Sequence, residues 1–146
     1  MEGALGLNPS AMIIEPLYQG ELTDALNNFW IPNTQKFAER YTWYTNWEIV
    51  LQESITSIGG IGFGGYPDGE GKTITGYYID KQQWGQGYAT EALGALVAWA
   101  ACCPDLKTII GETFPDHPAS IRVLEKNGFQ WVEINERIVR YSLCVR

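Results

Sequence analysis

Residues 82–90 have the residue types and spacing of an anion-binding turn. They read Gln-Gln-Trp-Gly-Gln-Gly-Tyr-Ala-Thr, between a predicted strand over 73–79 and a predicted helix over 88–101. Such a turn directs several free backbone N–H groups at one point, where the helix dipole adds partial positive charge. Gly85 and Gly87 let the backbone adopt positive φ and approach a ligand. The pattern therefore favours an anion such as a pyrophosphate, while a plain strand–helix turn with packing glycines stays open.

A second glycine pattern, formed by Gly60, Gly62 and Gly65, has the G-x-G-x-x-G spacing of dinucleotide-binding turns. That function requires a helix directly after the glycines, with the phosphate at its N-terminus. Residues 67–72 read Pro-Asp-Gly-Glu-Gly-Lys, which predicts a turn instead. The segment therefore favours a β-hairpin, and a nucleotide site on residues 59–73 is a distant alternative.

Helical periodicity predicts the elements that flank these turns. The clearest helix, over 88–101, carries an apolar stripe and is stopped by Pro104. A helix over 118–127 has proline in its first turn and glycine just after its end. Two earlier helices are predicted over 21–29 and 33–45, the latter with Phe37, Tyr41 and Tyr44 on one face.

Runs of β-branched and aromatic residues predict about seven strands, over 11–18, 47–52, 57–63, 73–79, 108–114, 129–134 and 138–145. The element order is β-α-α-β-β-β-α-β-α-β-β. The strand–helix–strand path from residue 73 to residue 114 implies one parallel pair within a mostly antiparallel sheet. The predicted fold class is mixed α/β (α+β), with about four helices flanking the sheet.

Composition narrows the class of protein. The chain has 146 residues, of which 45% are hydrophobic and 18% charged, so one folded domain over 1–146 is expected. Seventeen acidic and ten basic residues give a formal charge of −7, which disfavours nucleic acid as a partner. Three cysteines and a single histidine predict neither a disulfide framework nor a metal site. Without a signal peptide or a long apolar run, the expected location is cytoplasmic, with no membrane partner.

Two motifs together resemble the GNAT acetyltransferase superfamily. Gln82-x-x-Gly85-x-Gly87 matches its Q/R-x-x-G-x-G/A acetyl-CoA loop, and WGQGYATEAL is similar to the RimJ/RimL branch, the ribosomal-protein and related N-acetyltransferases. Residues 117–129, HPASIRVLEKNGF, resemble that branch's N-x-x-S-I-R-V-L-E-K-x-G-F. The resemblance covers residues 73–143 as a coenzyme-binding core. Residues 1–46 match in layout only, and in this family that part shapes the acceptor site.

The resemblance implies acetyl-CoA as co-substrate and no metal. Backbone groups near the end of the 73–79 strand would bind the pantetheine arm, and the glycine turn would hold the pyrophosphate. The coenzyme residues so implied are Ile79, Gln82, Trp84, Gly85, Gln86, Gly87, Tyr88, Ala89, Thr90 and His117. At position 117 histidine replaces the family's asparagine, and its imidazole can still donate a hydrogen bond to the pantetheine amide or relay a proton.

Direct attack of an amine on the thioester is the implied reaction, with Glu112 and Ser120 as candidate catalytic residues. Glu112 occupies the offset of a catalytic glutamate in RimI-type members and would accept the amine proton, with Glu48 and Glu53 as alternatives. RimI-type members place a tyrosine where this chain has Leu124, which cannot donate. Ser120 would therefore assist the departing thiolate. The structural alternatives are an ion pair at Glu112 and a helix-start role for Ser120.

The acceptor site is expected in residues 18–50, which are rich in aromatic residues and flanked by acids that would steer a cationic amine. The expected function is acetyl transfer to a primary amine, on a protein N-terminus or a small molecule. The main rival is an acyl-CoA-binding module that has lost catalysis and acts as a sensor or interaction domain. A homodimer stays open.

Overall fold

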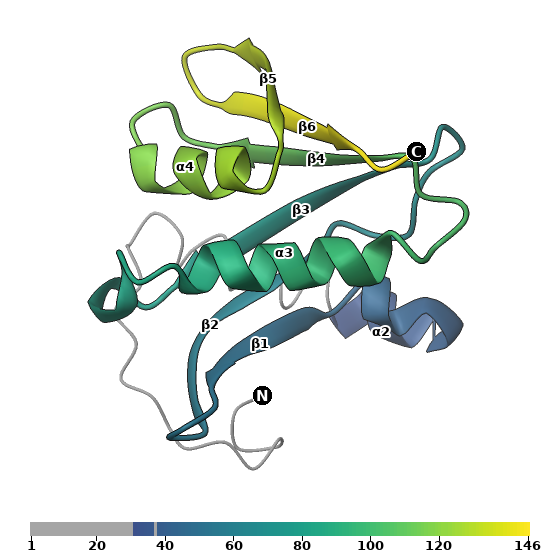
Figure 1. Cartoon of the computed structure of the whole chain (residues 1–146). Helices are drawn as coiled ribbons and strands as arrows, with labels where there is room; N and C mark the ends of the chain where they lie inside the picture. The colour runs from purple at the N-terminus through teal and green to yellow at the C-terminus, as the bar shows by residue number, and fades with distance from the viewer. Residues whose placement is uncertain (1–30, 37) are drawn as a thin grey trace. The chain divides into compact units, whose positions relative to one another are not determined.

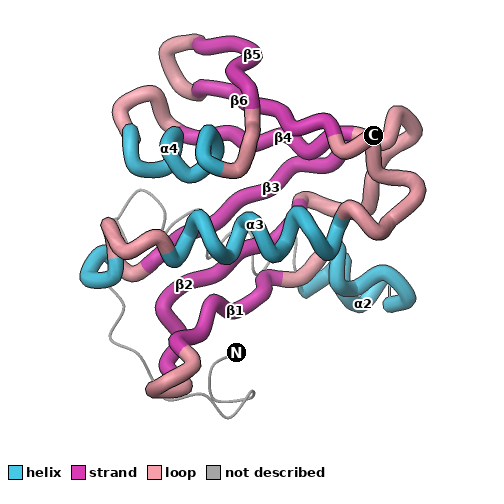
Figure 2. Tube along the Cα trace, in the orientation of Figure 1, coloured by secondary structure: helices cyan, strands magenta, loops and turns pink. Residues whose placement is uncertain are grey.

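The computed structural model describes residues 31–36 and 38–146. These residues form six strands, three α-helices and two short 3-10 helices (Figure 2). They divide into two compact units, the described residues of Met1–Gly62 with Tyr77–Tyr88, and Phe63–Gly76 with Ala89–Arg146. The predicted strand over 11–18 and helix over 21–29 lie outside the described residues. The single domain over 1–146 stays a prediction.

The strands are β1 (Asn46–Leu51), β2 (Thr56–Phe63), β3 (Lys72–Ile79), β4 (Thr108–Thr113), β5 (Gln130–Ile134) and β6 (Val139–Cys144). They hydrogen-bond in the order β1-β2-β3-β4-β6-β5 (Figure 1). β3 and β4 are parallel, whereas β1 with β2, β4 with β6 and β5 with β6 are antiparallel. The mixed, mostly antiparallel sheet is confirmed, and each of these strands begins and ends within one residue of its predicted bounds.

The single helix predicted over 33–45 is wrong. The chain forms α2 (Ile31–Lys36) and then a 3-10 helix, η3 (Ala38–Trp43), in which Arg40 has the non-helical angles φ −125 and ψ 24. After Arg40 come Tyr41, Thr42, Trp43 and Tyr44, all aromatic or β-branched residues that lose χ1 freedom in an α-helix. The Tyr44 N–H donates to the carbonyl of Tyr41 at 2.9 Å, the bond of a tighter turn. Phe37, part of the predicted stripe, lies outside the described residues.

In the second unit, α3 (Tyr88–Ala100) and α4 (Pro118–Lys126) confirm the two strongest helix predictions. Leu93, Leu96 and Ala100 form the buried face of α3, as the periodicity predicts. At the end of α4, Gly128 has φ +84, and the N–H groups of residues 128 and 129 donate back to the carbonyls of residues 125 and 124. This is the glycine helix stop predicted from the sequence.

Helix α4 packs against β4 and is tied to α3. A Cβ on Gly111 of β4 would lie 2.5 Å from a methyl carbon of Leu124, so the strand and the helix approach closely. The Asn127 side chain donates to the carbonyl of Thr90, in the first turn of α3, at 3.2 Å. Within this unit the start of α3, the end of α4 and the middle of β4 are therefore fixed relative to one another.

The turn before β3 closes on its own carboxylate. Oδ1 of Asp68 accepts the N–H groups of Glu70 at 2.8 Å and Lys72 at 3.0 Å, and Gly71 has φ +78. The hydrogen bonds from Lys72 and Glu70 lower the pKa of Asp68 below its usual value. The hairpin turn predicted over 67–72 is confirmed. No helix within the described part of the chain is long and apolar enough to cross a membrane.

Candidate functional site

The segment between β3 and α3 starts at a buried carboxylate. Asp80, only 6% exposed, caps the short 3-10 helix η4 (Lys81–Gln83), and its Oδ1 accepts the Gln82 N–H at 3.1 Å. Its own N–H donates to the carbonyl of Ile58 on β2 at 2.6 Å. The start of the segment is therefore anchored to the sheet. Sequence reasoning missed Asp80, although aspartate directly before a helical turn is a typical N-cap signal.

The two turn glycines have the geometry that the anion-binding prediction requires. Gly85 has φ +80 and Gly87 has φ +83, a conformation that side-chain-bearing residues rarely adopt. Apart from the adjoining residues, a Cβ built on either glycine would meet no atom of the described residues within 4 Å, so this part of the chain leaves open space above the turn. Tyr88 then begins α3, whose first N–H groups have no intrahelical acceptors. Backbone donors and open space therefore occur together here.

Trp84 and Ile79, both assigned to the coenzyme, contact each other. The indole N–H of Trp84 donates to the carbonyl of Ile79 at 2.9 Å, while the residue stays 37% exposed. The Nζ of Lys81 lies 5.7 Å from the centroid of the Trp84 ring. One lone pair of the Ile79 carbonyl is thus occupied, so a pantetheine hydrogen bond to this oxygen would use the second. The Gln86 side chain donates to that of Gln83 at 3.1 Å.

His117 and Ser120 meet at the start of α4. His117 is the N-cap residue, and its Nδ1 accepts the backbone N–H of Ser120 at 3.3 Å. In a neutral ring the proton therefore resides on Nε2, the nitrogen that could donate to a ligand. Both residues are half-buried. The cap accounts for the histidine structurally, and its coenzyme role stays a prediction.

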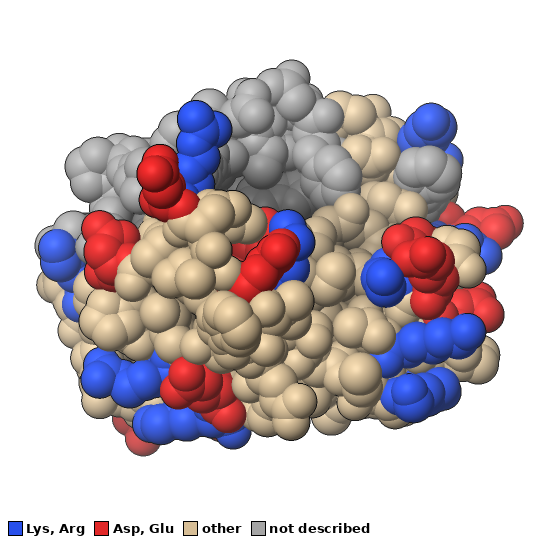
Figure 3. Space-filling view, turned by 90° about the horizontal axis from the view of Figure 1, so that it is seen from above, with Lys and Arg blue, Asp and Glu red and all other residues tan. Residues whose placement is uncertain are grey.

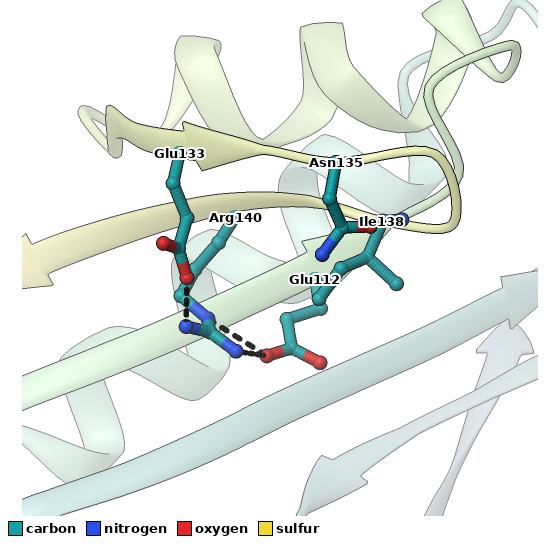
Figure 4. A network of polar contacts seen from close by, with 5 residues as sticks. All are labelled: Glu112, Glu133, Asn135, Ile138 and Arg140. Atoms are coloured by element: carbon teal, nitrogen blue, oxygen red, sulfur yellow. Dashed lines mark hydrogen bonds and ion pairs between the residues drawn. The ribbon is translucent and has the colours of Figure 1, made fainter.

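Glu112 lies near the end of β4 and forms an ion pair, the structural alternative stated for it from the sequence, with a partner, Arg140, that sequence reasoning missed. Its Oε1 accepts two hydrogen bonds from Arg140, from Nε at 2.8 Å and from Nη2 at 2.7 Å (Figure 4). The Nη1 of Arg140 donates to Oε1 of Glu133. The hydrogen bond to Glu112 is the largest cause that raises the pKa of Arg140. Glu112 is therefore not a lone acid on an apolar strand.

The alternative bases lie elsewhere. Glu48, in β1, accepts a hydrogen bond from the hydroxyl of the buried Ser57, and Glu53 is exposed in the turn after β1. Leu124, which stands where RimI-type members have tyrosine, is 1% exposed and packs in the core against Gly111. The structure therefore gives position 124 a packing role.

β3 and β4 part close to Glu112. Their parallel register ends with Thr75 opposite Gly111, so Gly76 and Glu112 are not paired, although β4 continues to Thr113. The hydroxyl of Thr113 is buried and has no hydrogen-bond partner in the described part of the chain. Glu112 thus lies where the hydrogen bonding between the two strands stops.

Charges of both signs are intermingled on the face drawn in Figure 3, where the described residues form no extended basic patch. Among residues 31–36 and 38–146, no three His, Cys, Asp or Glu side chains are grouped to hold a metal ion.

Residues 8–130 match the family model of the acetyltransferase (GNAT) domain. YjdG, an uncharacterized N-acetyltransferase of Bacillus subtilis, is 33% identical over 86 residues, which are 59% of this chain and 51% of that protein. The chain therefore spans about half the length of the curated relatives it matches.

Solved structures share the fold. A GNAT-family acetyltransferase from Bacillus anthracis superposes with a TM-score of 0.59 and 24% identity, covering 68% of this chain and 66% of its own. RimL, a ribosomal L7/L12 alpha-N-protein acetyltransferase solved with coenzyme A, superposes with a TM-score of 0.55 and 21% identity. The match covers 62% of this chain and 57% of RimL. A chimera of the spermidine N-acetyltransferase SpeG from Vibrio cholerae superposes with a TM-score of 0.57 and 15% identity. The match covers 67% of this chain and 64% of the chimera.

Proposed function

Because the chain belongs to the GNAT acetyltransferase family, we propose that it transfers an acetyl group from acetyl-CoA to a primary amine. The observation that carries the proposal is the turn before α3, where two positive-φ glycines with open space around their Cβ positions directly precede the helix N-terminus. The names of similar proteins support an amine acceptor, since RimL acts on a protein N-terminus and SpeG on spermidine. The acceptor class of this chain is either a peptide N-terminus or a small-molecule amine.

The coenzyme would be held mainly by backbone groups. The N–H groups around Gly85 and Gly87 and at the start of α3 would bind the pyrophosphate, because charge-assisted hydrogen bonds to oxyanions are strong. Ile79 and Nε2 of His117 would bind the pantetheine arm. Gln82, Trp84 and Gln86 have exposed side chains that flank the turn, and they would contact the coenzyme from there.

The reaction would be direct transfer. The amine nitrogen forms a bond to the acetyl carbonyl carbon, the carbon–sulfur bond breaks, and the coenzyme leaves as a thiolate. Glu112 would accept the amine proton, directly or through a water, and Ser120 would stabilise the leaving sulfur by a hydrogen bond. No covalent enzyme intermediate is needed, so the three cysteines have no part in the reaction.

The direct test is thiol release from acetyl-CoA in the presence of separate amines: a peptide with a free N-terminus, spermidine, an arylamine and an aminoglycoside. We expect release that depends on one class of amine, with the acetylated product detected by mass spectrometry. Release at the amine-free background rate with every acceptor, by a protein that binds acetyl-CoA, would contradict transferase activity and support the binding module.

The role of Glu112 is tested by Glu112→Gln, which keeps the shape and removes the basicity. A positioned general base is worth about 10²–10⁴ in rate, so kcat/KM should fall by that order at neutral pH while acetyl-CoA affinity is retained. Part of the loss should be recovered at high pH, where more of the amine is already neutral. Glu48→Gln is the matched control, and a larger effect there than at Glu112 would place the base on β1.

The role of Ser120 is tested by Ser120→Ala. Because stabilisation of the thiolate develops only in the transition state, kcat should fall while the acetyl-CoA Kd stays unchanged. The backbone N–H that donates to His117 is retained in this variant. Unchanged turnover with a good acceptor would leave Ser120 with its helix-start role alone.

One observation favours the second candidate, an acyl-CoA-binding module without catalysis. Position 124, where RimI-type members have their tyrosine, holds a fully buried leucine that cannot reach a ligand without disrupting the core. A binding module would show tight acetyl-CoA binding, no amine-dependent thiol release, and no effect of Glu112→Gln.

A further inference from the structure

Three charged side chains form a row across three neighbouring strands of the second unit. Arg140 on β6 is directly opposite Glu112 on β4 and opposite Glu133 on β5 in the strand registers. The guanidinium donates through Nε and Nη2 to Glu112 and through Nη1 to Glu133 (Figure 4). One cation therefore holds two carboxylates at once.

The two carboxylates are not held equally. Both hydrogen bonds to Glu112 end on Oε1, so Oε2 has no hydrogen-bond partner among the residues that the structure describes. Figure 4 shows this second oxygen on the side of the carboxylate away from the guanidinium. The Glu112 side chain is 27% exposed and that of Glu133 is 54% exposed. Glu112 thus presents one fixed oxygen and one available oxygen.

Among the residues that the structure describes, the contacts of Glu112 involve one cation. Arg140 faces it from β6, with Glu133 beyond on β5, and β3 ends its pairing with β4 at the uncharged Thr75. On the opposite face of β4, α4 packs through Leu124 against Gly111. On α4, the Glu125 carboxylate accepts the Tyr141 hydroxyl at 2.9 Å. The guanidinium of Arg140 is therefore the group that orients the Glu112 carboxylate.

We propose that Arg140 is a positioning residue for acetyl transfer, which holds the Glu112 carboxylate through Oε1 and directs its Oε2 toward the acceptor amine. The inference rests on the proposed function. The guanidinium fork fixes the orientation of the carboxylate, which an ammonium at the same place would do less well. Glu133 anchors the far side of the guanidinium.

The test is kcat and the KM for the amine in the parent chain and in Arg140→Met, Arg140→Lys and Glu133→Gln. In Arg140→Met kcat should fall by up to about 100-fold, because a misplacement of a catalytic group by about 1 Å can cost about 10² in rate. Arg140→Lys should restore only part of this loss, because an ammonium lacks the guanidinium fork. Glu133→Gln, the matched control, leaves Arg140 and Glu112 in place and should lose the least.

Acetyl-CoA affinity should stay unchanged in all three variants, because none of the substituted residues is a proposed coenzyme ligand. If the parent chain transfers acetyl groups and Arg140→Met keeps the parent's kcat, or loses acetyl-CoA affinity as much as kcat, this inference alone is overturned. If the parent transfers nothing, the proposed function fails and the inference fails with it. Should Arg140→Met not fold, judged by its thermal melt, Arg140→Lys decides: an unchanged kcat would overturn the proposal.

Discussion

Glycine serves two different purposes in two segments of the same unit. In β2, a Cβ on Gly59 or Gly60 would overlap Tyr78 or Asn46, and one on Gly62 would lie 2.7 Å from a backbone oxygen. None of these three residues has a positive φ. In the turn before α3, Gly85 and Gly87 have positive φ and open space above them. The first set allows close packing, whereas the second allows an unusual backbone conformation and leaves open space.

The comparison shows why glycine spacing alone does not identify a nucleotide site. Gly60 and Gly62 lie inside a strand, the segment has no room for a ligand at these positions, and a turn follows it instead of a helix. The hairpin interpretation is thus confirmed. The turn at 85–87 leads directly into α3, so its glycines combine open space around their Cβ positions with a helix N-terminus directly after them.

The largest effect is expected at the open turn, from Gly87→Glu. A side chain at φ +83 is strained, and its negative charge would lie where the pyrophosphate is proposed to bind. We expect acetyl-CoA affinity to fall by about 2–4 kcal/mol, or about 30- to 1000-fold, with the fold retained. Calorimetry of acetyl-CoA binding measures the loss.

Gly69→Glu is the matched control for this variant. Gly69 lies in the exposed turn over 67–72, has no positive φ, and also leaves open space around a Cβ. The same charge at this position should leave acetyl-CoA affinity unchanged. Equal losses in the two variants would mean that the added net charge, not the position, weakens binding.

Substitution of a glycine packed inside β2 should lower the stability of the fold and leave acetyl-CoA affinity nearly unchanged. In Gly59→Ala the new Cβ would overlap the backbone oxygen of Tyr78, which cannot move without shifting β3. Overpacking of this kind costs about 1–3 kcal/mol and sometimes more. We expect a lower free energy of unfolding in urea, and little change in acetyl-CoA affinity for the molecules that remain folded. An alanine variant as stable as the parent would show that β2 and β3 can shift apart to fit the Cβ at no cost in stability.

Most elements could be predicted because their boundaries depend on local signals. Pro118 and Gly128 mark the two ends of α4. Runs of β-branched and aromatic residues predict β4 and β6. The predicted helix over 33–45 failed because its apolar spacing fits one face, while Arg40 leaves the helical region and the following residues are poor helix formers. Periodicity reports which residues face the core, not whether the backbone stays continuous.

A smaller effect is expected from Gly85→Ala. Open space surrounds the position, so the cost comes only from the backbone conformation, about 1–2 kcal/mol for a residue with a Cβ in the left-handed region. We expect a modest fall in the melting temperature and less than about a tenfold loss of acetyl-CoA affinity. A loss as large as that of Gly87→Glu would indicate that the turn binds the ligand only in its present backbone conformation.

The smallest effect is expected in the turn over 67–72. Its backbone N–H groups donate to the carboxylate of Asp68, not to an external anion. Because the folded pKa of Asp68 is lowered, its contribution to stability is complete above the unfolded pKa of about 4 and is lost as the pH falls through the folded value. Asp68→Asn should therefore melt slightly below the parent at pH 7. Melting curves from pH 7 to pH 2 should show this difference shrinking, and a difference that grows toward acid would contradict the assignment.

The candidate site was only partly predictable. The backbone geometry of the turn proposed to bind the coenzyme could be predicted, because glycine positions report backbone geometry directly. The pairing of Glu112 with Arg140 could not, because it depends on the register between β4 and β6, which no local pattern specifies. The sequence places His117 directly before the helix predicted over 118–127, while its hydrogen bond to the Ser120 N–H required the structure.

Binding of S-acetylpantetheine, compared with acetyl-CoA, tests the central claim most directly. The smaller thioester lacks the nucleotide and its pyrophosphate, so on the parent chain it should bind at least about 30-fold more weakly, if the glycine turn contributes about 2 kcal/mol or more. In Gly87→Glu the advantage of acetyl-CoA should largely disappear, while S-acetylpantetheine affinity stays near that of the parent. Equal affinity of the two ligands for the parent chain, or an advantage that persists in Gly87→Glu, would show that the turn before α3 does not bind the pyrophosphate.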